Sequence, residues 1–575
     1  MQTKIETWED LDFGLIVDRV FQVQRRIFRA SQAGDYETMH KHQRHLVQMF
    51  HTRALAVYLA AEVSDGRSTA GVDGKKNLTA PQKLKLAQSL RLSNQPDPVL
   101  RKQIPKPGSQ DTRPLGIPTI ADRALQHLIR MALEPEWEAR FDRSMYGFRK
   151  GRSCHDALIN IRLNIQRCPK WVLDADIEKF FDRLDHDALL KKLDTFPAMH
   201  KAIHRVLKAG MMEGEILNPT ELGTPQGGPL SPLLANIALC GMEYDLIQAF
   251  PPERVIDNKR IVKPPRIVTY ADDFVVLHES KAVVEECSRF IADWLSPLGL
   301  NLSPTKTSVR HTLKLVDGNR GIEFLGCEIR QHAADKHQIK PFFNGVYTHI
   351  GPSKKAQKRI YAECARIIDE VVLHKKRNAE YAYKEAKGEE TPVERLIKKL
   401  NAKLGGWAAY HRSHHSKRAF STLDHKLFIK LLRWAKRRHP RWSRKRLIDE
   451  YFNGGTPWSF RAPGKEPKEE VILKRVDSTP IKRHIPIRSE KSFYDGDWAY
   501  WGKRSGDYPG IPWGVSSLLQ RQNGKCWHCN RGIESSDRVA IQKIPGPKDR
   551  AVNRLVHEPC SALNRRYPTR DAFVR

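Results

Sequence analysis

The sequence Arg266-Ile267-Val268-Thr269-Tyr270-Ala271-Asp272-Asp273-Phe274-Val275-Val276-Leu277 places two adjacent carboxylates between two apolar runs. Apolar runs on either side of a short polar break predict a strand, a tight turn and a second strand. Carboxylates at the tip of an apolar hairpin are costly unless a cation neutralises them, and Mg²⁺ is the natural candidate because it binds carboxylate and phosphate oxygens. An exposed Asp-Asp turn explains the tetrapeptide equally well, so both interpretations stand at this point.

A partner carboxylate lies upstream, in Trp171-Val172-Leu173-Asp174-Ala175-Asp176-Ile177-Glu178-Lys179-Phe180-Phe181-Asp182. An apolar strand start precedes the acidic residues and a helical pattern follows them, so we expect Asp176 at the C-terminal end of a strand. Beside the Asp272-Asp273 turn it would complete a two-metal site. In such a site one ion activates an attacking hydroxyl and the other stabilises a departing pyrophosphate. For Asp174 and Asp182 we favour solvated or ion-paired carboxylates.

The composition indicates a polyanionic partner. Lys and Arg total 99 against 66 Asp and Glu, a formal net charge of +33 over 575 residues, with 40% hydrophobic residues. Such an excess over a globular chain favours nucleic acid. No apolar run of about 18 residues and no signal-peptide segment is present, so we expect no membrane association and a cytoplasmic protein. The 9 cysteines are mostly scattered, which argues against a disulfide framework.

The chain is long enough for several domains, and its texture changes along its length. Residues 8–62 show apolar positions at helical spacing, residues 100–345 mix short β-like runs with helices, and long basic amphipathic stretches begin near residue 352. These patterns predict an α+β multidomain protein. We expect boundaries at 1–99, 100–350, 351–455, 456–514 and 515–575.

Several further segments carry a resemblance to a known family. They are Ile104-Pro105-Lys106-Pro107, Arg113-Pro114-Leu115-Gly116-Ile117-Pro118, Tyr146-Gly147-Phe148-Arg149, Gly223-Thr224-Pro225-Gln226-Gly227-Gly228-Pro229-Leu230-Ser231-Pro232, and Ser303-Pro304-Thr305-Lys306-Thr307. In this order the sequence resembles a group II intron-encoded protein, a combined reverse transcriptase and maturase, over nearly its whole length. The resemblance implies a right-hand polymerase, with an N-terminal extension and the start of the fingers in 1–99 and fingers and palm in 100–350. A helical thumb and maturase domain would follow in 351–455, a DNA-binding region in 456–514, and a small zinc-binding HNH-like module in 515–575.

The resemblance also implies roles at the polymerase site. Asp176, Asp272 and Asp273, with the backbone carbonyl of Ile177, would bind two Mg²⁺ ions. Lys306 would protonate the pyrophosphate leaving group. Phe181 would exclude a 2′-hydroxyl and so favour deoxynucleotides, with core packing as the alternative role for this ring. The residues expected to contact nucleotide or template are Lys106, Arg113, Arg149, Phe181, Gln226, Gly227 and Asn236.

The thumb and maturase region interleaves cations with aromatic residues, a pattern that suits RNA because charge follows phosphates while rings stack on unpaired bases. We expect Trp407 and Tyr410 in the core of this region rather than on RNA. A dense cationic cluster around a helix break is the better RNA-binding candidate. It consists of Lys436, Arg437, Arg438, Arg441, Arg444, Lys445 and Arg446.

The C-terminal unit carries Cys526, Cys529, His557 and Cys560, a donor set that suits a tetrahedral structural Zn²⁺ site. His528 is less well placed as a ligand. In the family this unit is an HNH endonuclease, but here Gln542-Lys543 stands where the family has Asp-His, and Ser561 replaces the final His. A protonated Lys cannot act as the general base that His would supply. We therefore expect a cleavage-inactive module that retains DNA binding.

The expected function is RNA-directed DNA polymerisation, coupled to binding and splicing of a group II intron RNA and to copying of that RNA during intron mobility. The expected partners are the intron RNA, target DNA and dNTPs, with a homodimer as a further possibility. The ribonucleoprotein would be associated with the bacterial nucleoid. Two alternatives remain open: a splicing-only maturase with a vestigial polymerase site, and a domesticated or defence-associated reverse transcriptase without an intron.

Overall fold

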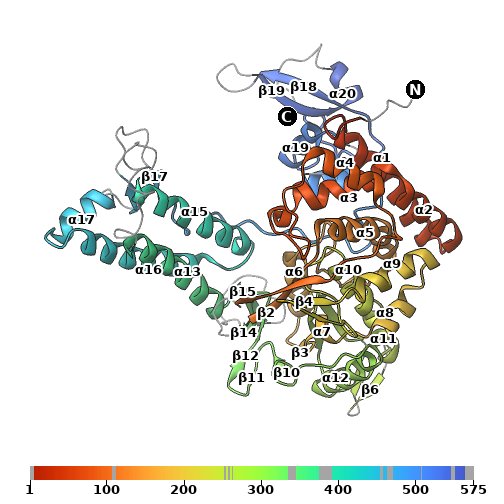
Figure 1. Ribbon diagram of the computed structural model, residues 1–575. Coiled ribbons are helices and arrows are strands. Elements are labelled where there is room, and N and C mark those ends of the chain that lie inside the picture. The colour runs from red at the N-terminus through yellow and green to blue at the C-terminus, as the bar shows by residue number, and fades with distance from the viewer. Residues whose placement is uncertain are drawn as a thin grey trace.

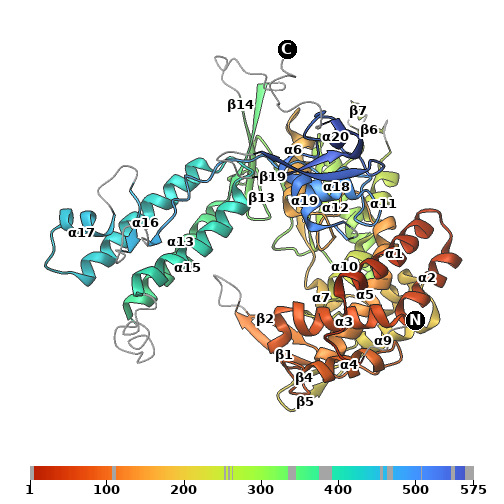
Figure 2. The same cartoon turned by 90° about the horizontal axis from the view of Figure 1, so that it is seen from above.

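The computed structural model shows a broad body of helices and sheets, from which a lobe of long helices projects (Figure 1). The structure describes residues 6–105, 112–251, 254–256, 259–261, 263–333, 345–373, 391–452, 458–462, 471–506, 508–509, 511–545 and 551–563. The view from above shows the same separation of lobe and body (Figure 2). Within these ranges, no helix is both long enough and apolar enough to cross a membrane.

The first helices form a bundle against a long buried helix, α5 (Ile120–Arg140). Asp12 and Asp35 begin the first two helices, because each side chain accepts a backbone N–H of the first turn. The amide of Gln24 and the hydroxyl of Ser31 donate to backbone carbonyls of α5. The bundle confirms the helical prediction for residues 8–62. Its helices are α1 (Phe13–Gln32), α2 (Tyr36–Gln48), α3 (Phe50–Tyr58) and α4 (Ala80–Ser89).

A four-stranded sheet extends from this bundle in the order β2-β1-β4-β5. β1 and β2 pair as an antiparallel hairpin, and β4 joins β1 in parallel. The hairpin leads from the body towards the side that faces the helical lobe (Figures 1 and 2). The strands are β1 (Val99–Pro105), β2 (Thr112–Ile117), β4 (Met211–Glu213) and β5 (Ile216–Asn218).

The central sheet has the order β10-β3-β9-β8, all antiparallel. Alternate residues of its strands face opposite sides. Val172 and Val275 pack with α6 (Cys154–Ile165), whereas Leu173 and Phe274 pack in the core that includes α12 (Lys281–Leu295). A sheet covered on both faces holds its strand register firmly, because a one-residue slip would reverse every side chain. The strands are β3 (Trp171–Asp176), β8 (Arg266–Tyr270), β9 (Asp273–His278) and β10 (Ser308–His311).

Shorter elements complete the body. The helices are α7 (Phe180–Arg183), α8 (His186–Leu193), α9 (Pro197–Leu207), α10 (Ser231–Leu239) and α11 (Met242–Ala249). The strand pairs are β6 (Arg254–Ile256) with β7 (Lys259–Ile261), and β11 (Leu315–Val316) with β12 (Asn319–Arg320). A three-stranded sheet, β13 (Ile322–Phe324), β14 (Cys327–Ala333) and β15 (Val346–Pro352), leads into the lobe.

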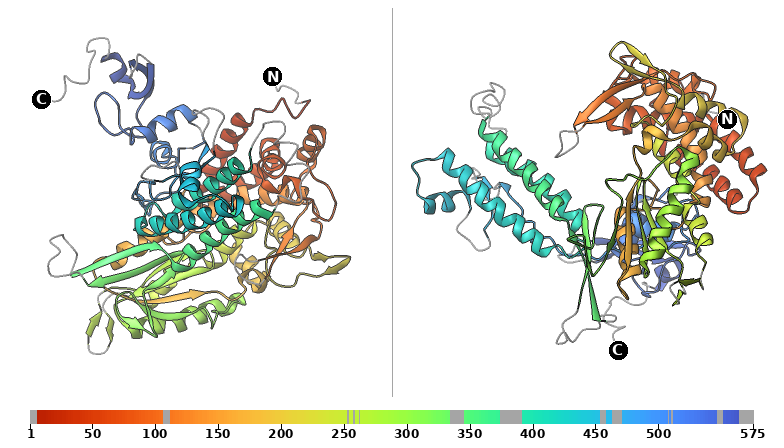
Figure 3. Two further views of the ribbon diagram at one scale, coloured as in Figure 1. Left: turned by 90° about the vertical axis from the view of Figure 1, so that its left-hand side faces the viewer. Right: turned by 90° about the horizontal axis from the view of Figure 1, so that it is seen from below.

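The helical lobe has its own apolar core and confirms the helical texture predicted from residue 352 onwards. Its helices are α13 (Lys354–Leu373), α15 (Pro392–His411), α16 (Lys417–Arg438) and α17 (Arg444–Tyr451). Trp407 packs against this core, and the Tyr410 hydroxyl donates to the Leu325 carbonyl in the turn between β13 and β14. Both aromatic residues therefore have structural roles, as the sequence predicts. The view from below shows the lobe extending away from the body (Figure 3, right).

The chain returns from the lobe to the body before its last unit. β16 (Arg461–Ala462) and β17 (Val471–Ile472) complete the lobe core, whereas Tyr494 and Trp501 pack with Phe21 and Phe28 of α1. The described parts of 456–514 are thus divided between lobe and body rather than forming a separate core. The final elements are α18 (Trp498–Ser505), which packs on α1 through Trp501, and α19 (Trp513–Arg521), β18 (Val539–Pro545), β19 (Ala551–His557) and α20 (Glu558–Leu563).

Candidate active site

The turn between β8 and β9 is the predicted acidic hairpin tip. Tyr270 pairs with Asp273, so Ala271 and Asp272 form a two-residue turn. Ala271 has φ +56°, a left-handed conformation that costs free energy in a residue with a Cβ and persists only where neighbouring structure holds it. The strand–turn–strand prediction is confirmed.

The antiparallel pairing of β3 and β9 brings the third carboxylate to this turn. Asp176 is the direct partner of Asp273 across the two strands. Like charges that face each other across a sheet repel, so this register is unfavourable without a cation between them. The structure therefore brings Asp176, Asp272 and Asp273 together, as the sequence predicts.

The electrostatics of the three carboxylates fit a cation site. Burial raises the pKa of Asp273 to about 7, and the neighbouring charges of Asp272 and Asp176 act in the same direction. Burial also raises the pKa of Asp272. A cluster of oxygen donors that cannot all remain ionised unaided is suited to a hard divalent cation such as Mg²⁺.

Lys306 supplies a positive charge at this cluster. Its Nζ lies 2.5 Å from Oδ2 of Asp176, and its side chain is 67% exposed. The loop that carries it is tied to β3, because the Ser303 amide donates to the Asp176 carbonyl and the Glu178 amide donates to the Asn301 carbonyl. These two bonds lie on either side of Ile177 and do not use its carbonyl. Sequence and structure thus agree that Lys306 belongs to the site, where it neutralises Asp176.

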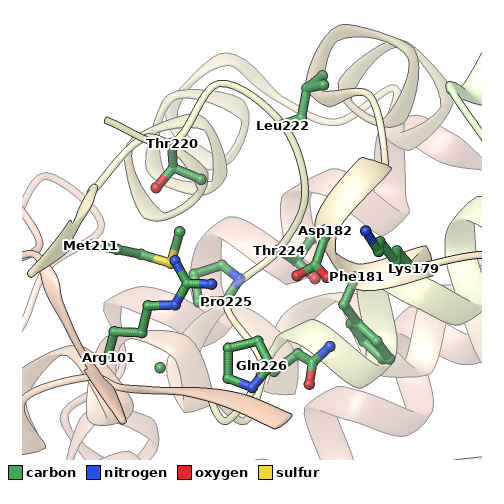
Figure 4. A pocket seen from close by; sticks show the side chains of 12 residues that line it. Arg101, Lys179, Phe181, Asp182, Met211, Thr220, Leu222, Thr224, Pro225 and Gln226 are labelled. Atoms are coloured by element: carbon green, nitrogen blue, oxygen red, sulfur yellow. The ribbon is translucent and has the colours of Figure 1, made fainter. Parts of the chain in front are cut away.

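A cavity of 440 Å³ lies between the β1–β2 hairpin, α7 and the loop 220–226, and its lining includes Lys179 and Phe181, which follow Asp176 closely in the chain (Figure 4). Phe181 and Gln226 line it, whereas the neighbouring ring of Phe180 is only 2% exposed. Phe180 therefore fills the core and Phe181 faces the cavity. The hydroxyls of Thr220 and Thr224 also line it, are buried, and have no hydrogen-bond partner among the described residues.

Close backbone packing fixes the loop that carries Gln226. The Gly116 amide donates to the Gln226 carbonyl at 2.7 Å, which ties the loop to β2. Gly227 has φ +129°, and a Cβ there would lie 2.5 Å from the Gly116 carbonyl oxygen. Only glycine fits this approach, so the role of Gly227 is to let the loop lie against the hairpin.

The structure describes only one of the two cations that are predicted to contact phosphates near the β1–β2 hairpin. Arg113 is exposed on β2, and its charge acts on Asp272, so it lies within electrostatic reach of the carboxylates. Lys106 lies outside the described residues.

Arg149 does not reach the cavity, and the prediction that it contacts template or phosphate is wrong. Its guanidinium is buried against Glu138, with Nε and Nη2 each 3.0 Å from a carboxylate oxygen. Nη1 donates to the carbonyls of Asp142 and Met145. A buried cation requires such pairing, and the pairing leaves Arg149 as a structural group.

Asn236 also has a structural role, and the prediction that it faces the nucleotide pocket is wrong. Its side chain is buried, and Nδ2 donates to the Gly147 carbonyl at 2.8 Å. Gly147 in turn lies against the acidic turn, since a Cβ at Gly147 would be 2.4 Å from the Ala271 amide nitrogen. Asn236 therefore supports the turn through Gly147. The sequence does not predict this role of Gly147, because no local pattern indicates a contact with Ala271.

The four C-terminal metal-ligand candidates are brought together as predicted. The donor atoms of Cys526, Cys529, His557 and Cys560 all lie within 4.8 Å of one another. Sulfur and nitrogen atoms at such spacing fit a tetrahedral ion bound at about 2.0–2.3 Å. Nε2 of His557 lies 3.2 Å from Asp537, the carboxylate–histidine arrangement that orients a metal-binding ring. His528 instead contacts Gln542, so it is not part of the cluster.

The seven cations of the predicted RNA-binding cluster are all exposed at the far end of the lobe, around the break between α16 and α17 (Figure 1). Two of them lie over aromatic rings, Arg446 over Trp442 at 4.2 Å and Arg438 over Trp434 at 5.7 Å. Lys436 donates to the Trp442 carbonyl, which holds the break closed. The cluster thus presents a fixed basic surface remote from the carboxylates.

Comparisons with known proteins agree with this geometry. Residues 104–329 match the family model for reverse transcriptase (RNA-dependent DNA polymerase), residues 8–90 match the N-terminal domain of reverse transcriptase, and residues 384–452 match the group II intron maturase-specific domain. Protein YkfC of Escherichia coli is 32% identical over 46% of this chain and 76% of its own length. The group II intron-encoded protein LtrA of Lactococcus lactis is 31% identical over 46% of this chain and 53% of its own length. A solved telomerase of Candida albicans is similar at a TM-score of 0.32 and 12% identity, over 64% of each chain.

The close contact behind the acidic turn makes a specific prediction for Gly147. In Gly147→Ala the new methyl group must displace the Ala271 backbone, so we expect the free energy of unfolding of the body to fall by about 1–3 kcal/mol in urea denaturation. Gly405→Ala is the control, because that glycine lies within α15 with nothing within 4 Å of its Cβ position. The control should be neutral or more stable by up to about 1 kcal/mol. Equal stability of Gly147→Ala and the unmodified chain would contradict the contact.

Proposed function

The chain belongs to the group II intron-encoded reverse transcriptases that carry a maturase domain, and we propose that it binds a group II intron RNA, promotes its splicing and copies it into DNA. The observation that supports this most directly is the convergence of Asp176, Asp272 and Asp273 at the ends of the paired strands β3, β8 and β9. The chain spans about half the length of LtrA, so the activities of that whole protein are proposals here.

Asp176, Asp272 and Asp273, with the Ile177 carbonyl, would hold two Mg²⁺ ions. When bound, Mg²⁺ lowers the pKa of the primer 3′-hydroxyl and neutralises charge on the phosphates. The primer 3′-hydroxyl releases its proton to water, its oxygen attacks the α-phosphorus of a dNTP, and the bond to the bridging oxygen of pyrophosphate breaks. Lys306 leaves Asp176 and donates its Nζ proton to that bridging oxygen. The carboxylates thus hold the charge while Lys306 supplies the proton.

The cavity residues would select and place the nucleotide. Phe181 lines the cavity, where its ring would exclude a ribose 2′-hydroxyl, so the site would favour dNTPs over rNTPs. Gln226 and the exposed cation Arg113 would contact the nucleotide and its phosphates, and we propose the same role for Lys106 by its place in the sequence motif. The unpartnered hydroxyls of Thr220 and Thr224 offer further hydrogen bonds to a nucleic-acid strand.

The metal-binding role of the turn is tested by Asp272→Asn. An amide of the same shape cannot carry the negative charge that a divalent ion requires, so primer extension on an RNA template should fall by about 10²–10³-fold. The measurement is single-nucleotide addition to a DNA primer in the presence of Mg²⁺. Asp293→Asn on the exposed face of α12 is the control and should extend normally. No extension by the unmodified chain would favour the splicing-only alternative.

The basic surface of the lobe is the proposed site of intron RNA binding. Seven exposed cations lie around a helix break where Trp434 is buried in the lobe core and Trp442 packs against it, so phosphates can be neutralised without opening the core. The break between α16 and α17 lies at the far end of the lobe, away from β3 in the body (Figure 1), so mutation can separate RNA binding from polymerisation.

The triple variant Arg441→Glu/Arg444→Glu/Lys445→Glu should therefore lose splicing assistance while extending a primer on a simple template normally. Each lost phosphate contact also reduces the salt dependence of intron RNA binding. The slope of the logarithm of the association constant against the logarithm of the salt concentration should therefore become less steep by about 2–3. The control reverses three exposed cations of the body, Lys201, Lys263 and Arg289, with the same change in net charge. Splicing that survives in the first variant would refute the assignment.

The C-terminal module is proposed to hold a structural Zn²⁺ ion and to bind target DNA without cutting it. Its ligand cluster closes the base of the β18–β19 hairpin, where β19 ends at His557 and α20 begins. Lys543 lies directly opposite Asn553 on this hairpin, and the Gln542 amide contacts His528. This surface offers hydrogen bonds and positive charge but not the acidic and imidazole groups of the family's nuclease.

Cys560→Ser tests the zinc proposal. Removing one of four ligands should lower the zinc content from about one ion per chain to near zero, and should make the module sensitive to protease, because a structural zinc site stabilises its fold directly. His528→Gln is the matched control, since His528 lies between the two cysteines in sequence but outside the cluster. Zinc retained in Cys560→Ser, or lost in His528→Gln, would contradict the ligand set.

A further inference from the structure

Residues 483–505, here called the brace segment, lie against the body beside the polymerase motif Tyr146–Ser153. The segment comes from the region assigned to DNA binding by resemblance, yet its large aromatic residues Tyr494 and Trp501 are directed into the protein. Tyr494 and Trp501 are both fully buried, and they pack with Phe21 and Phe28 of α1. Burial of two large aromatic residues makes this a stable contact rather than a loose tail.

Asp156 is the central polar contact of this interface. One carboxylate oxygen, Oδ2, accepts the Ser153 amide and caps α6. The other, Oδ1, accepts Nη2 of Arg504 at 2.6 Å, the backbone amide of Ile487 at 2.9 Å, and lies 3.0 Å from Nε2 of His484. Burial would raise the pKa of Asp156, but the His484 and Arg504 contacts outweigh it and lower the pKa to about 2. Both oxygens of a fully buried carboxylate are therefore used, one by the body and one by the brace segment.

The neighbouring residues of the motif also contact the brace segment. Gly151 has φ +73°, and a Cβ there would lie 2.2 Å from the ring of Trp501. Nζ of Lys150 donates to the Tyr494 hydroxyl at 2.9 Å and pairs with Glu134 of α5 at 3.3 Å. Nη1 of Arg504 donates to the Ile485 carbonyl, so the same guanidinium links two parts of the brace segment and contacts Asp156.

The same motif supports the acidic turn from behind. The Tyr146 amide donates to the Thr269 carbonyl at 2.9 Å, which pairs the start of the motif with β8. Gly147 lies against Ala271, and α6 packs on β8. Eleven residues, from Tyr146 to Asp156, thus connect the brace segment to the turn that carries Asp272 and Asp273.

We propose that the brace segment is a positioning element of the polymerase: through Asp156, Gly151 and Lys150 it fixes the Tyr146–Ser153 motif, and that motif holds the acidic turn in its left-handed conformation. The metal-binding carboxylates are then aligned only when the C-terminal region is docked. Arg504, His484 and Tyr494 are positioning residues, because none of them lines the nucleotide cavity. The proposal rests on the polymerase function proposed above and adds a dependence on the C-terminal region.

The test is Arg504→Ala in the full chain. Hydrogen–deuterium exchange should show the amides of residues 266–278 exchanging about tenfold faster, because the turn loses its support. In primer extension, kcat should fall by about tenfold to a hundredfold with little change in KM for dNTP, since misaligned carboxylates impair chemistry while the nucleotide contacts remain. Lys503→Ala is the matched control, since it removes the same charge from an exposed position of the same helix.

Exchange and kcat equal to those of the unmodified chain in Arg504→Ala would overturn the proposal. If Arg504→Ala does not fold, Tyr494→Phe decides, since it removes only the hydroxyl that accepts from Lys150. Exchange of residues 266–278 that is about two- to fivefold faster supports the proposal, and unchanged exchange overturns it. Because exchange requires no activity, an inactive unmodified chain would refute the proposed function without deciding the brace.

Discussion

The repulsion between Asp176 and Asp273 is the constraint on which the rest of the structure depends. The β3–β9 register sets these carboxylates opposite each other, with Asp272 beside them, so a nearby cation stabilises the arrangement. Lys306 supplies one positive charge, and its loop is fixed to β3 by two backbone hydrogen bonds. A sheet packed on both faces prevents the strands from slipping to a less repulsive register.

The surrounding polar residues maintain this costly geometry. Asn236 holds Gly147, Gly147 lies against Ala271, and Asp156 connects the same motif to the C-terminal region. Arg149 belongs to this support as well, because its ion pair with Glu138 fixes the end of the motif inside the body. Residues that resemble ligand contacts in sequence thus act behind the site, where they determine its shape.

The sequence predicts best what is local. Apolar periodicity predicts the acidic hairpin, the strand before Asp176 and the lobe helices. The C-terminal group of metal-ligand candidates is predicted by its two pairs of Cys and His residues, Cys526 with Cys529 and His557 with Cys560. The roles of Arg149 and Asn236 could not be predicted, because they depend on partners such as Gly147 that only the folded chain brings near. The contact of Trp501 with Gly151 is even harder to predict, because the two residues are far apart in sequence and the local sequence around each gives no indication of the other.

The most direct test is whether Asp176, Asp272 and Asp273 bind the catalytic metal ions. It requires a structure of the protein bound to a primer–template duplex, a non-hydrolysable dNTP and Mn²⁺ in place of Mg²⁺. Anomalous scattering should locate metal between Asp176, Asp272 and Asp273, with Nζ of Lys306 moved from Asp176 towards the phosphates. Metal bound elsewhere, or Lys306 still paired with Asp176 while the dNTP occupies the cavity, would contradict the account.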